Sequence, residues 1–463
     1  MRLYDTKEQR LVEVLPSPAG TIDIYCCGPT VYRFAHVGNL RTFLLGDLIR
    51  RTLAAEGVPY RYVQNITDVG HLNDDVNIDF QEDKILAQAK LEKKDPFEIA
   101  RFYEDVFHKD LAALNIEAAD AYPKASESIQ LIVDLIAQLI YIGAAYQGAD
   151  ESLYFSARSY KDYGAISKNS LDQLRAGYRF DLEDSSENQE TGKRFHADWA
   201  LWKAASKNRE MTWPTPWGVG FPGWHIECSA MSIHYFPRGV SLHLGGIDLR
   251  FPHHENERAQ SNIATNSEFV RQWVHGEHLL FEGKKMAKSS GNVLHISDVV
   301  EKRIDPLALR LLFLENHYRT QMNLTWDGIT AAHTTLKRWR RKVTSWPKGG
   351  TPSEEITLAV TESFGNDLDT ASALLLLRKF ERDESIDDAI NRATFLALEP
   401  LLGLDLENGA NEELTPAAQS LLKERALARA NKDWTRSDEL RDALSNMGVQ
   451  VMDGPEGQSW ELI

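Results

Sequence analysis

The first part of the chain carries hydrophobic patterns that predict a strand, a helix and a second strand. Polar and apolar residues alternate at the start of residues 21–27, which are rich in β-forming side chains. The segment runs into Gly28-Pro29, which ends a strand. Apolar positions at helical spacing run from Leu40 to Ala55, Gly57 ends that helix, and residues 60–66 again have the pattern of a strand. A strand, helix and strand over this distance form a βαβ unit, which predicts a parallel sheet covered by helices.

Further along, the pattern predicts two more strands, at residues 240–246 and 273–281. Between the two groups of strands lies a long stretch, residues 114–223, that begins with a helical segment at Ile129–Ile142. It ends in a loop rich in Trp, Pro and Gly at 213–218. We interpret this stretch as an insertion within a nucleotide-binding fold.

The last third of the sequence has mainly helical periodicity. Helices are predicted from about Thr320 to Leu402, followed by a linker over 403–415. The residues after the linker begin as a helix and end in a turn or hairpin region around 447–455. No run of about 18 apolar residues occurs, so we expect no membrane span.

Composition places the chain among ordinary globular proteins. Of its 463 residues, 43% are hydrophobic and 26% charged, which is enough to build a core. The N-terminus lacks the layout of a signal peptide. Three cysteines, two of them adjacent, do not form a disulfide framework, so we expect a cytoplasmic protein whose thiols act as ligands.

The net charge of −16 argues against a protein that coats nucleic acid without specificity. It does not exclude an RNA substrate, because binding requires only a local basic face. The run Lys337-Arg338-Trp339-Arg340-Arg341-Lys342 is one candidate for such a face. A solvated helix face explains the same run, and the sequence leaves both interpretations open.

Candidate metal ligands occur at two places in the sequence. Pro252 suits the first turn of a helix, on which His253 and Glu257 would lie one turn apart on the same side. Cys228, expected early in another helix, and a cysteine from the pair Cys26-Cys27 could complete a zinc site. The residues alone do not decide between Cys26 and Cys27, and they do not exclude His254 in place of His253. A purely structural interpretation is also open, because isolated buried cysteines are usually inert.

Two short segments suggest phosphate binding. His36-Val37-Gly38-Asn39 falls at a strand-to-helix junction, where free backbone N–H groups attract anions. Lys285-Met286-Ala287-Lys288-Ser289 would form a cationic loop for a leaving pyrophosphate. Taken alone, each segment is also compatible with an ordinary surface turn or loop.

In this order, the two segments resemble the signature loops of class I aminoacyl-tRNA synthetases. The segments Cys27–Tyr32, Asn65–Asp68, Gly223–Met231 and Phe251–Glu257 are similar to cysteinyl-tRNA synthetases. The similarity continues in Lys432-Asp433-Trp434 and in Asp453-Gly454-Pro455 with Trp460, so it extends over nearly the whole chain.

The resemblance implies a role for particular residues. The zinc ligands of the family correspond to Cys27, Cys228, His253 and Glu257, and the family's cysteine pocket corresponds to Thr67, Trp224 and His243. Its adenylate-forming residues correspond to His36, Asn39, Lys285 and Lys288, with Asp248 near the ribose and adenine. Its anticodon contacts correspond to Arg429, Asp438, Asp453 and Trp460.

The resemblance also implies an α/β fold, a Rossmann-like parallel sheet split by an insertion and followed by a helical bundle and a small anticodon-binding module. The expected parts are a catalytic domain at 1–113 and 224–317, an insertion at 114–223, a bundle at 318–405 and the module at 416–463. The implied activity is cysteine–tRNA ligation by a monomer, with L-cysteine, ATP with Mg²⁺ and tRNA(Cys) as partners. One Zn²⁺ per chain would select the substrate thiol over the hydroxyl of serine.

The sequence departs from the family at two signature positions. Asn39 stands where His is usual, and Ala287 where Ser is usual. Two other functions remain to be compared, a cysteine:aminosugar ligase of the mycothiol type and a non-catalytic RNA-binding paralogue. The aminosugar ligases lack the C-terminal module, and a paralogue that had lost its chemistry would be expected to lack zinc ligands or loop lysines.

Overall fold

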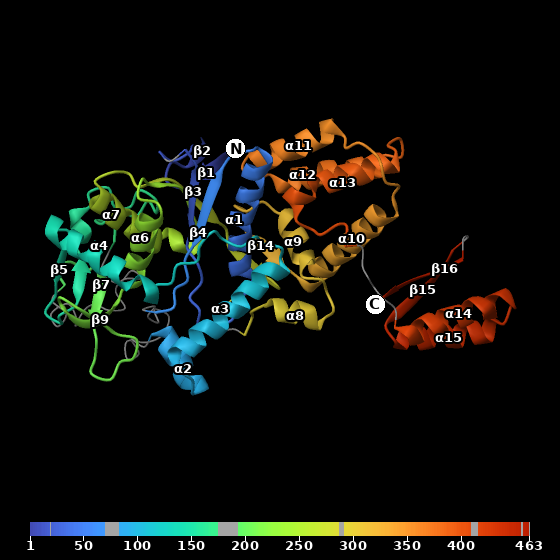
Figure 1. Cartoon of the computed structure of the whole chain (residues 1–463), viewed down its shortest axis with the longest axis horizontal. Coiled ribbons are helices and arrows are strands. Elements are labelled where there is room, and N and C mark those ends of the chain that lie inside the picture. Colours follow the sequence, from blue (N-terminus) through green and yellow to red (C-terminus); the bar gives the residue numbers. More distant parts are fainter. Residues whose placement is uncertain are drawn as a thin grey trace. The chain divides into compact units, whose positions relative to one another are not determined.

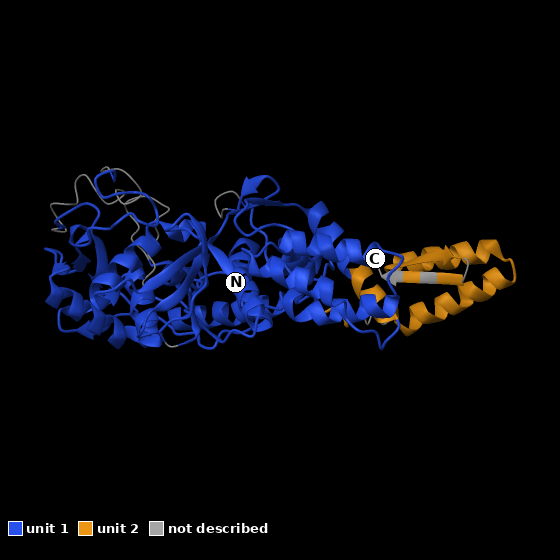
Figure 2. Cartoon of the chain, turned by 90° about the horizontal axis from the view of Figure 1, so that it is seen from above, with its two compact units in different colours: residues 1–336, 347–404 blue, residues 337–346, 405–463 orange. Residues whose placement is uncertain are grey.

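The computed structural model describes residues 1–18, 20–69, 83–174, 193–286, 291–408, 415–454 and 457–462. The chain forms two compact units, one of residues 1–336 and 347–404 and the other of residues 337–346 and 405–463 (Figure 2). The five-part division expected from the sequence is finer than these units and stays a prediction. No helix in the described ranges is both long and apolar enough to cross a bilayer.

A four-stranded parallel sheet forms the centre of the larger unit. Its strands are β3 (Ile22–Cys26), β4 (Tyr60–Gln64), β10 (Val240–Gly246) and β11 (Val270–Gly276), in the order β11-β10-β3-β4. Figure 1 shows helix α1 (Val37–Ala55) on one side of this sheet, and α6 (Trp224–Tyr235) and α7 (His253–Thr265) on the other. The predicted βαβ unit and the split parallel sheet are therefore confirmed.

Helix α1 begins three residues before the first periodic position, Leu40. His36 is its N-cap, so Val37, Gly38 and Asn39 form the first turn of the helix and not a loop before it. The hydrophobic periodicity missed this turn because Gly38 and Asn39 are not apolar, and His is not among the preferred N-cap residues.

The insertion contains a five-stranded antiparallel sheet that the hydrophobic pattern did not predict. Its strands are β5 (Ala145–Gln147), β6 (Leu153–Phe155), β7 (Trp199–Ala204), β8 (Trp213–Thr215) and β9 (Gly218–Pro222). Helix α4 has its predicted bounds, Ile129–Ile142. The loop expected at 213–218 is wrong, because β8 and β9 pair there as a hairpin. Several of these strands have only three residues, which is too short to show alternation.

The single strand predicted at 273–281 is also wrong. Strand β11 ends at Gly276, and β12 (Leu279–Phe281) belongs to a different sheet, with β13 (Lys284–Lys285) and β14 (Met322–Leu324). Strand β14 also interrupts the helical region expected from Thr320.

The remaining elements are mostly helical. The larger unit also contains the hairpin β1 (Arg2–Asp5) and β2 (Arg10–Glu13), and helices α2 (Lys84–Glu92), α3 (Pro96–Ala113), α8 (Ile296–Glu301), α9 (Leu307–Leu314), α11 (Glu354–Gly365), α12 (Thr370–Arg382) and α13 (Asp388–Leu402). Helix α10 (Trp326–Ser345) runs through both units. The smaller unit has α14 (Pro416–Ala430), α15 (Trp434–Asn446), and a hairpin of β15 (Val449–Gly454) and β16 (Gly457–Leu462), as predicted.

A buried ion cluster fixes α1 against the helical region. The Asp47 carboxylate lies 2.8 Å from Arg310 Nη2 of α9 and 2.8 Å from Arg51 Nε. Arg310 Nε donates to Leu402 O at 2.6 Å, and Arg51 Nη1 donates to Pro400 O at 2.7 Å, at the end of α13. Burial opposes ionisation of Asp47, but the guanidinium groups of Arg310 and Arg51 hold the pKa of Asp47 below its ordinary value. Helix α1, and with it the His36 turn, is thereby held in place.

Replacing Asp47 with Ala should therefore destabilise the protein strongly. The variant leaves buried guanidinium groups without a counter-charge, which typically costs about 3–5 kcal/mol. Urea unfolding of Asp47→Ala measures this loss, with Asp105→Ala, at an exposed position of α3, as the matched control. Equal unfolding midpoints for the two variants would show that the ion cluster does not support the fold.

Candidate metal and nucleotide site

Several predicted functional residues lie at the carboxyl edge of the parallel sheet. Cys27 directly follows β3, Thr67 lies just beyond β4, and Asp248 follows β10 on the short 3-10 helix η4 (Ile247–Arg250). Loops that leave parallel strands meet at this edge, and ligands of open α/β folds bind there. The sheet thus brings together residues that are far apart in the sequence.

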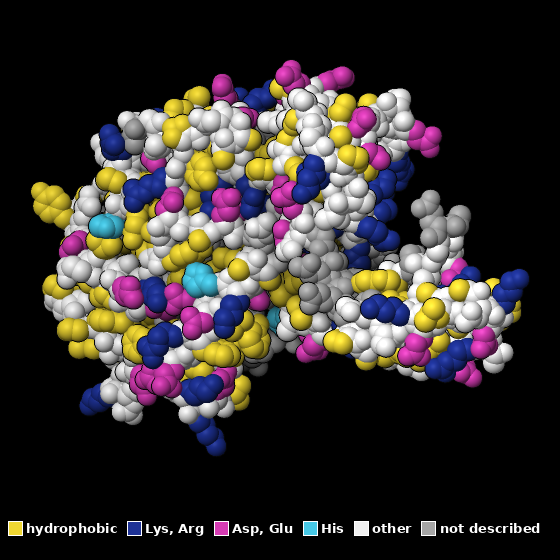
Figure 3. Space-filling view, turned by 45° about the vertical axis from the view of Figure 1, so that its right-hand side comes forward, with side chains coloured by type: hydrophobic (Ala, Val, Ile, Leu, Met, Phe, Trp, Pro, Cys, Tyr) yellow, Lys and Arg dark blue, Asp and Glu magenta, His cyan; other side chains and the backbone are white. Residues whose placement is uncertain are grey.

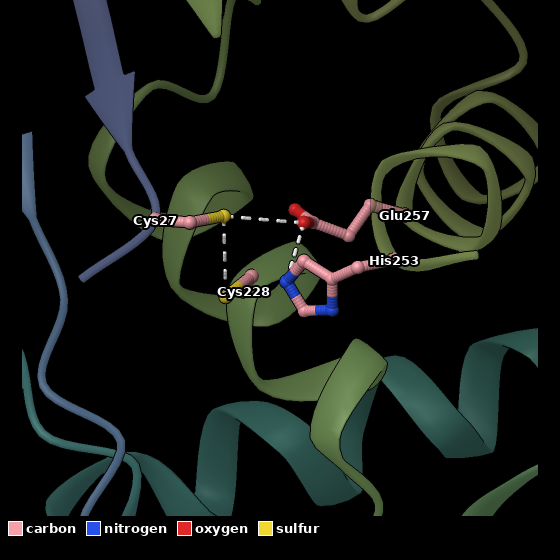
Figure 4. A group of neighbouring side chains, drawn as sticks. All are labelled: Cys27, Cys228, His253 and Glu257. Carbon is pink, nitrogen blue, oxygen red and sulfur yellow. Dashed lines mark hydrogen bonds and ion pairs between the residues drawn. The ribbon is translucent and has the colours of Figure 1, made fainter. Parts of the chain in front are cut away.

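Cys27, Cys228, His253 and Glu257 form one buried cluster (Figure 4). Their ligand atoms all lie within 4.8 Å of one another. Cys27 Sγ is 3.9 Å from Cys228 Sγ and 3.4 Å from Glu257 Oε1, and His253 Nε2 is 2.8 Å from Glu257 Oε1. Figure 4 shows the four side chains pointing toward one another, and they come from the end of β3, from α6 and from α7.

The structure distinguishes Cys27 from Cys26. Adjacent side chains of an extended segment point in opposite directions. Within the described residues, Cys26 belongs to no group of possible metal ligands, whereas Cys27 Sγ faces Cys228. Gly28 then follows where a Cβ would lie 1.6 Å from Asn65 O, so only glycine lets the chain leave β3 this close to its neighbour.

His253 and His254, the two alternatives that the sequence left open, both face the cluster. His254 and His243 form a second group of possible ligands with Cys27 and Glu257, again with all ligand atoms within 4.8 Å. His254 Nε2 and His243 Nε2 each lie 3.4 Å from Cys27 Sγ. The two groups differ in their donors, because the one that contains His253 has two thiols and the other has one.

Hydrogen bonds behind the cluster orient its imidazole rings. His253 Nδ1 lies 2.9 Å from His225 Nδ1, and His254 Nδ1 lies 2.8 Å from His275 Nε2. Neither His225 nor His275 has a role predicted from the sequence. His225 lies within Gly223–Met231, a segment similar to the family, and that similarity was the one available signal. His275 lies in no motif, and only its position near the end of β11 reveals it.

The cluster has the properties of a site for a divalent cation. Its four residues are between 1% and 4% exposed. Burial raises the pKa of the Cys27 thiol well above its ordinary value, raises the pKa of Glu257 to about 7 and lowers that of His253 to about 3. Oε2 of Glu257 has no hydrogen-bond partner in the described part of the chain. A cation would offset the cost of burying these donors as ligands, so the residues fit a metal held by sulfur, nitrogen and oxygen.

His36 and Asn39 cap helix α1 reciprocally. His36 Nδ1 accepts a hydrogen bond from the Asn39 N–H at 3.2 Å, and Asn39 Oδ1 accepts one from the His36 N–H at 3.3 Å. Burial, with smaller effects of Arg33 and His295, lowers the pKa of His36 to about 4. A neutral ring whose Nδ1 is an acceptor carries its proton on Nε2. The cap therefore leaves an Nε2–H donor for a ligand and gives Asn39, the unusual residue here, a definite structural role.

The two signature segments meet in the fold. A Cβ at Gly38 would lie 3.0 Å from the His36 ring and 3.2 Å from Met286 Cε, so glycine allows the second segment to approach the first turn of α1. The Val37 N–H also donates to Leu294 O at 2.9 Å, just beyond the second segment.

The second segment is anchored by Asn292, whose Nδ2 donates to Phe281 O at 2.8 Å and to Lys284 O at 3.2 Å. Lys285 is exposed at the end of β13. The predicted catalytic Lys288, like Ala287, lies outside the described residues.

Of the predicted substrate-binding residues, three border or join the buried cluster. The Thr67 hydroxyl accepts a hydrogen bond from Asn65 Nδ2 at 3.2 Å, and Asn65 Oδ1 lies 3.7 Å from Cys228 Sγ. Trp224 stacks on the His253 ring with centroids 4.1 Å apart. His243 is fully buried among the possible ligands themselves, whereas Asp248 is exposed on η4.

In the smaller unit, the predicted contacts Arg429 and Asp453 pair directly, at 3.0 Å. The Asp453 carboxylate also accepts two hydrogen bonds from the buried Arg425, at 3.0 and 2.9 Å, and one from Arg441 at 2.6 Å. Asp438 lies 3.9 Å from Arg441 and is largely exposed. These residues form one charged cluster on α14, α15 and β15.

Trp460 differs from the other three predicted anticodon residues. It is half-buried on β16 and packs against the small apolar core of this unit, which comprises Ala418, Leu422, Leu444, Val449 and Val451. Part of its role is therefore packing, which the sequence similarity did not indicate.

Comparison with known proteins identifies two families. Residues 13–334 match the family of "tRNA synthetases class I (C) catalytic domain", and residues 411–460 match the "Cysteinyl-tRNA ligase anticodon binding domain". Solved structures with similar folds include a Mycobacterium tuberculosis methionyl-tRNA synthetase in complex with methionyl-adenylate, with a TM-score of 0.56, 15% identity, and coverage of 83% of this chain and 92% of that one. At this identity the likeness concerns the fold alone.

Curated relatives extend over the whole chain. A cysteine–tRNA ligase of Thermus thermophilus is 40% identical and covers 99% of both chains. Cysteine–tRNA ligase 1 of Burkholderia lata is 38% identical, over 99% of this chain and 96% of its own. With the catalytic-domain match over more than half of its residues, the chain belongs to the cysteine–tRNA ligase family of class I tRNA synthetases.

Proposed function

We propose that this chain activates L-cysteine with ATP to give cysteinyl-adenylate, and then transfers the cysteinyl group to tRNA(Cys). The observation that carries this proposal is the buried cluster of Cys27, Cys228, His253 and Glu257 at the same sheet edge as the His36 turn. The family match at 411–460 favours an RNA acceptor over an aminosugar. The intact ligand set argues against a paralogue without chemistry.

The proposed metal is one Zn²⁺ per chain, held by Cys27, Cys228, His253 and Glu257. Two thiols with an imidazole and a carboxylate favour zinc over the hard cations Mg²⁺ and Ca²⁺, which prefer oxygen ligands. We prefer this group to the one with His254 because it contains both thiols. When bound, Zn²⁺ supplies a position that takes the substrate thiol as a thiolate and is a far poorer partner for a hydroxyl.

The surrounding residues hold the amino acid and the phosphates. Trp224 and Thr67 are proposed to shape the cysteine pocket, with His243 behind it, and Asp248 to lie near the ribose and adenine. The Nε2–H of His36 is directed to the α-phosphate, with Asn39 fixing the ring. Lys285 and Lys288 neutralise the leaving pyrophosphate together with Mg²⁺. Positioning and charge neutralisation of this kind are sufficient for adenylate formation.

The acceptor RNA is proposed to bind through its anticodon to Arg429, Asp438, Asp453 and Trp460. One chain contains both the metal cluster and the nucleotide segments, so a monomer suffices for the chemistry. Thiols that serve as metal ligands are best preserved in a reducing compartment, which is consistent with a cytoplasmic enzyme.

Replacing Cys228 with Ser should remove the metal and the activity together, because a hydroxyl is a poor zinc ligand. We expect zinc content to fall to well below one ion per chain, and cysteine-dependent ATP–pyrophosphate exchange to fall by about 100-fold or more. Metal analysis and the exchange assay measure these values. The control is Cys26→Ser, which changes the thiol next to Cys27 that belongs to neither ligand group. This variant should retain its zinc. Full zinc occupancy and exchange in Cys228→Ser would refute the assignment.

The exchange rate should not titrate with His36 between pH 6 and pH 8. Its pKa of about 4, below the usual 6.5, keeps the ring neutral throughout this range. Because the folded-state pKa is depressed, the stability linked to His36 is complete above pH 6.5 and is lost as pH falls toward 4. His36→Asn should lower the rate about 100-fold at all these pH values, with little change in the KM for cysteine. An inflexion near pH 6.5 that disappears in the variant would contradict a neutral His36.

Replacing Arg429 with Gln should weaken tRNA use without affecting amino-acid activation. We expect the KM for tRNA(Cys) to rise about tenfold, since a good contact to a base is worth about 1–3 kcal/mol, while pyrophosphate exchange is unchanged. Arg436→Gln is the matched control, because Arg436 is an exposed arginine of the same unit that pairs with Glu439 at 3.0 Å. If both variants have the same KM, Arg429 does not contact the RNA.

A further inference from the structure

One buried carboxyl group beside the metal cluster has no role in the proposed function. Figure 3 shows Asp and Glu side chains scattered over the protein surface, where water solvates their charge. Glu227, on helix α6, is instead fully buried, and neither of its carboxyl oxygens has a hydrogen bond of ordinary geometry to the described part of the chain. A buried polar group without a well-formed hydrogen bond is costly, so its presence here requires an explanation.

Two other buried carboxylates, Asp68 and Asp83, lie close enough to act electrostatically on Glu227, and both have partners of their own. Asp68 accepts hydrogen bonds from the N–H and the hydroxyl of Ser126, at 2.8 and 2.5 Å. Asp83 caps helix α2 and pairs with Arg209 at 2.8 Å. In this group of three, Glu227 is the one whose carboxyl has no such bond among the described residues.

The position of Glu227 on helix α6 places it beside the proposed cysteine pocket. Residues three and four apart are neighbours on one side of a helix, so Trp224 has both Glu227 and Cys228 next to it. Within the described residues, Glu227 belongs to neither group of possible metal ligands. Because Glu227 is fully buried, it can act on a bound amino acid only through a side chain that lies between them.

Thr67 is a side chain through which Glu227 can act. Burial, followed by the charges of Asp68 and Asp83, raises the pKa of Glu227 well above its ordinary value, whereas hydrogen bonding with the Thr67 side chain lowers it. A hydrogen bond that lowers the pKa of a carboxyl group is one that the carboxyl oxygen accepts. The Thr67 hydroxyl therefore directs its proton toward Glu227.

Hydrogen bonds on the other side of Thr67 fix the same direction. The Gly28 N–H donates to Asn65 Oδ1 at 2.9 Å, so the Asn65 amide presents its Nδ2 to Thr67 and donates to the hydroxyl oxygen at 3.2 Å. The backbone of Thr67 is held as well, because its N–H donates to Pro29 O at 3.0 Å. The Thr67 oxygen thus accepts from Asn65, and its own proton is left for Glu227.

This arrangement determines what the Thr67 hydroxyl can offer to a substrate. A hydroxyl group has one proton to donate and two lone pairs that accept. In Thr67 the proton is directed to Glu227 and one lone pair is used by Asn65, so the remaining lone pair can only accept a hydrogen bond. Of the two charged groups of an amino acid, the α-ammonium donates hydrogen bonds and the α-carboxylate does not. Thr67 is therefore suited to the ammonium group.

We propose that Glu227 is a positioning residue for amino-acid recognition. By holding the hydroxyl proton of Thr67, it leaves Thr67 Oγ1 as an acceptor for the α-ammonium group of the substrate. This inference rests on the proposed function and adds to it a second point of recognition, because the metal recognises the thiol and Thr67 recognises the amino group. A thiol that lacks an α-amino group would satisfy the metal alone.

The test compares the binding of L-cysteine with that of β-mercaptopropionate, which has the same thiol and carboxylate but no amino group. Isothermal titration calorimetry of the zinc-replete full chain measures both dissociation constants, while zinc analysis and thermal unfolding report on the site and the fold. Glu227→Met removes the acceptor oxygens and retains a long side chain with good helix propensity. The matched control, Glu227→Gln, removes the charge but retains an oxygen that can accept the Thr67 proton.

We expect Glu227→Met to bind cysteine about tenfold more weakly, the usual effect of losing a hydrogen bond to a charged group, and to bind β-mercaptopropionate as tightly as the unaltered protein does. Glu227→Gln should retain most of the preference for cysteine. A loss shared equally by both ligands would make Glu227 a structural residue and overturn the proposal, as would unchanged binding of cysteine to Glu227→Met. Equal losses in the Met and Gln variants would also overturn it, because the charge and not the acceptor oxygen would then matter.

A shorter carboxyl side chain replaces the Met variant if that variant does not fold. Glu227→Asp withdraws the carboxyl from Thr67 by one methylene group and should show the same selective loss of cysteine binding. Failure of the proposed function gives a different result: the unaltered protein would neither bind cysteine nor support cysteine-dependent ATP–pyrophosphate exchange. An unaltered protein that does both, with a Met or Asp variant that keeps its full preference for cysteine, would refute the Glu227 proposal alone.

Discussion

The structure depends on the burial of thiol, imidazole and carboxylate groups at one edge of a parallel sheet. Cys27, Cys228, His253 and Glu257 are almost inaccessible to water, and burial is the largest cause that raises the pKa values of Cys27 and Glu257 and lowers that of His253, so it opposes the charged form of each. Such a cluster is costly unless a cation compensates for it. In the proposed function, the two thiols of this cluster favour a soft ligand from the substrate, and this preference is the source of the selectivity.

The surrounding fold holds this cluster next to the nucleotide segments. Gly28 lets β3 pass close to Asn65, whose side chain reaches both Thr67 and Cys228. On the other side of β3, the His36–Asn39 cap starts α1, and the ion cluster around Asp47 fixes that helix. The proposed amino-acid pocket and the proposed phosphate donors are thus positioned by elements that diverge from the same strand.

The sequence predicted the sheet and its split because these features have local signatures. Candidate metal ligands were visible in the same way, but the choice between Cys26 and Cys27 and between His253 and His254 rested on the family resemblance. The alternation at β3, the one-turn spacing of His253 and Glu257 and the two signature segments are all visible in short windows. The antiparallel sheet of the insertion was missed because three of its five strands have only three residues each. His275 was missed because only the fold brings it to His254, and Arg425 because only the hairpin β15–β16 brings Asp453 to it. Asn39, which stands where the family usually has His, could be explained only from the structure, in which it caps helix α1 together with His36.

The most direct test of the account is cysteine-dependent ATP–pyrophosphate exchange by the unaltered protein, with serine as the comparison, before and after removal of its metal. The account predicts about one zinc per chain, exchange with cysteine and not with serine, loss of exchange on chelation and recovery when zinc is restored. Exchange that persists in metal-free protein, or that is as fast with serine as with cysteine, would contradict the claim that the buried cluster selects the substrate.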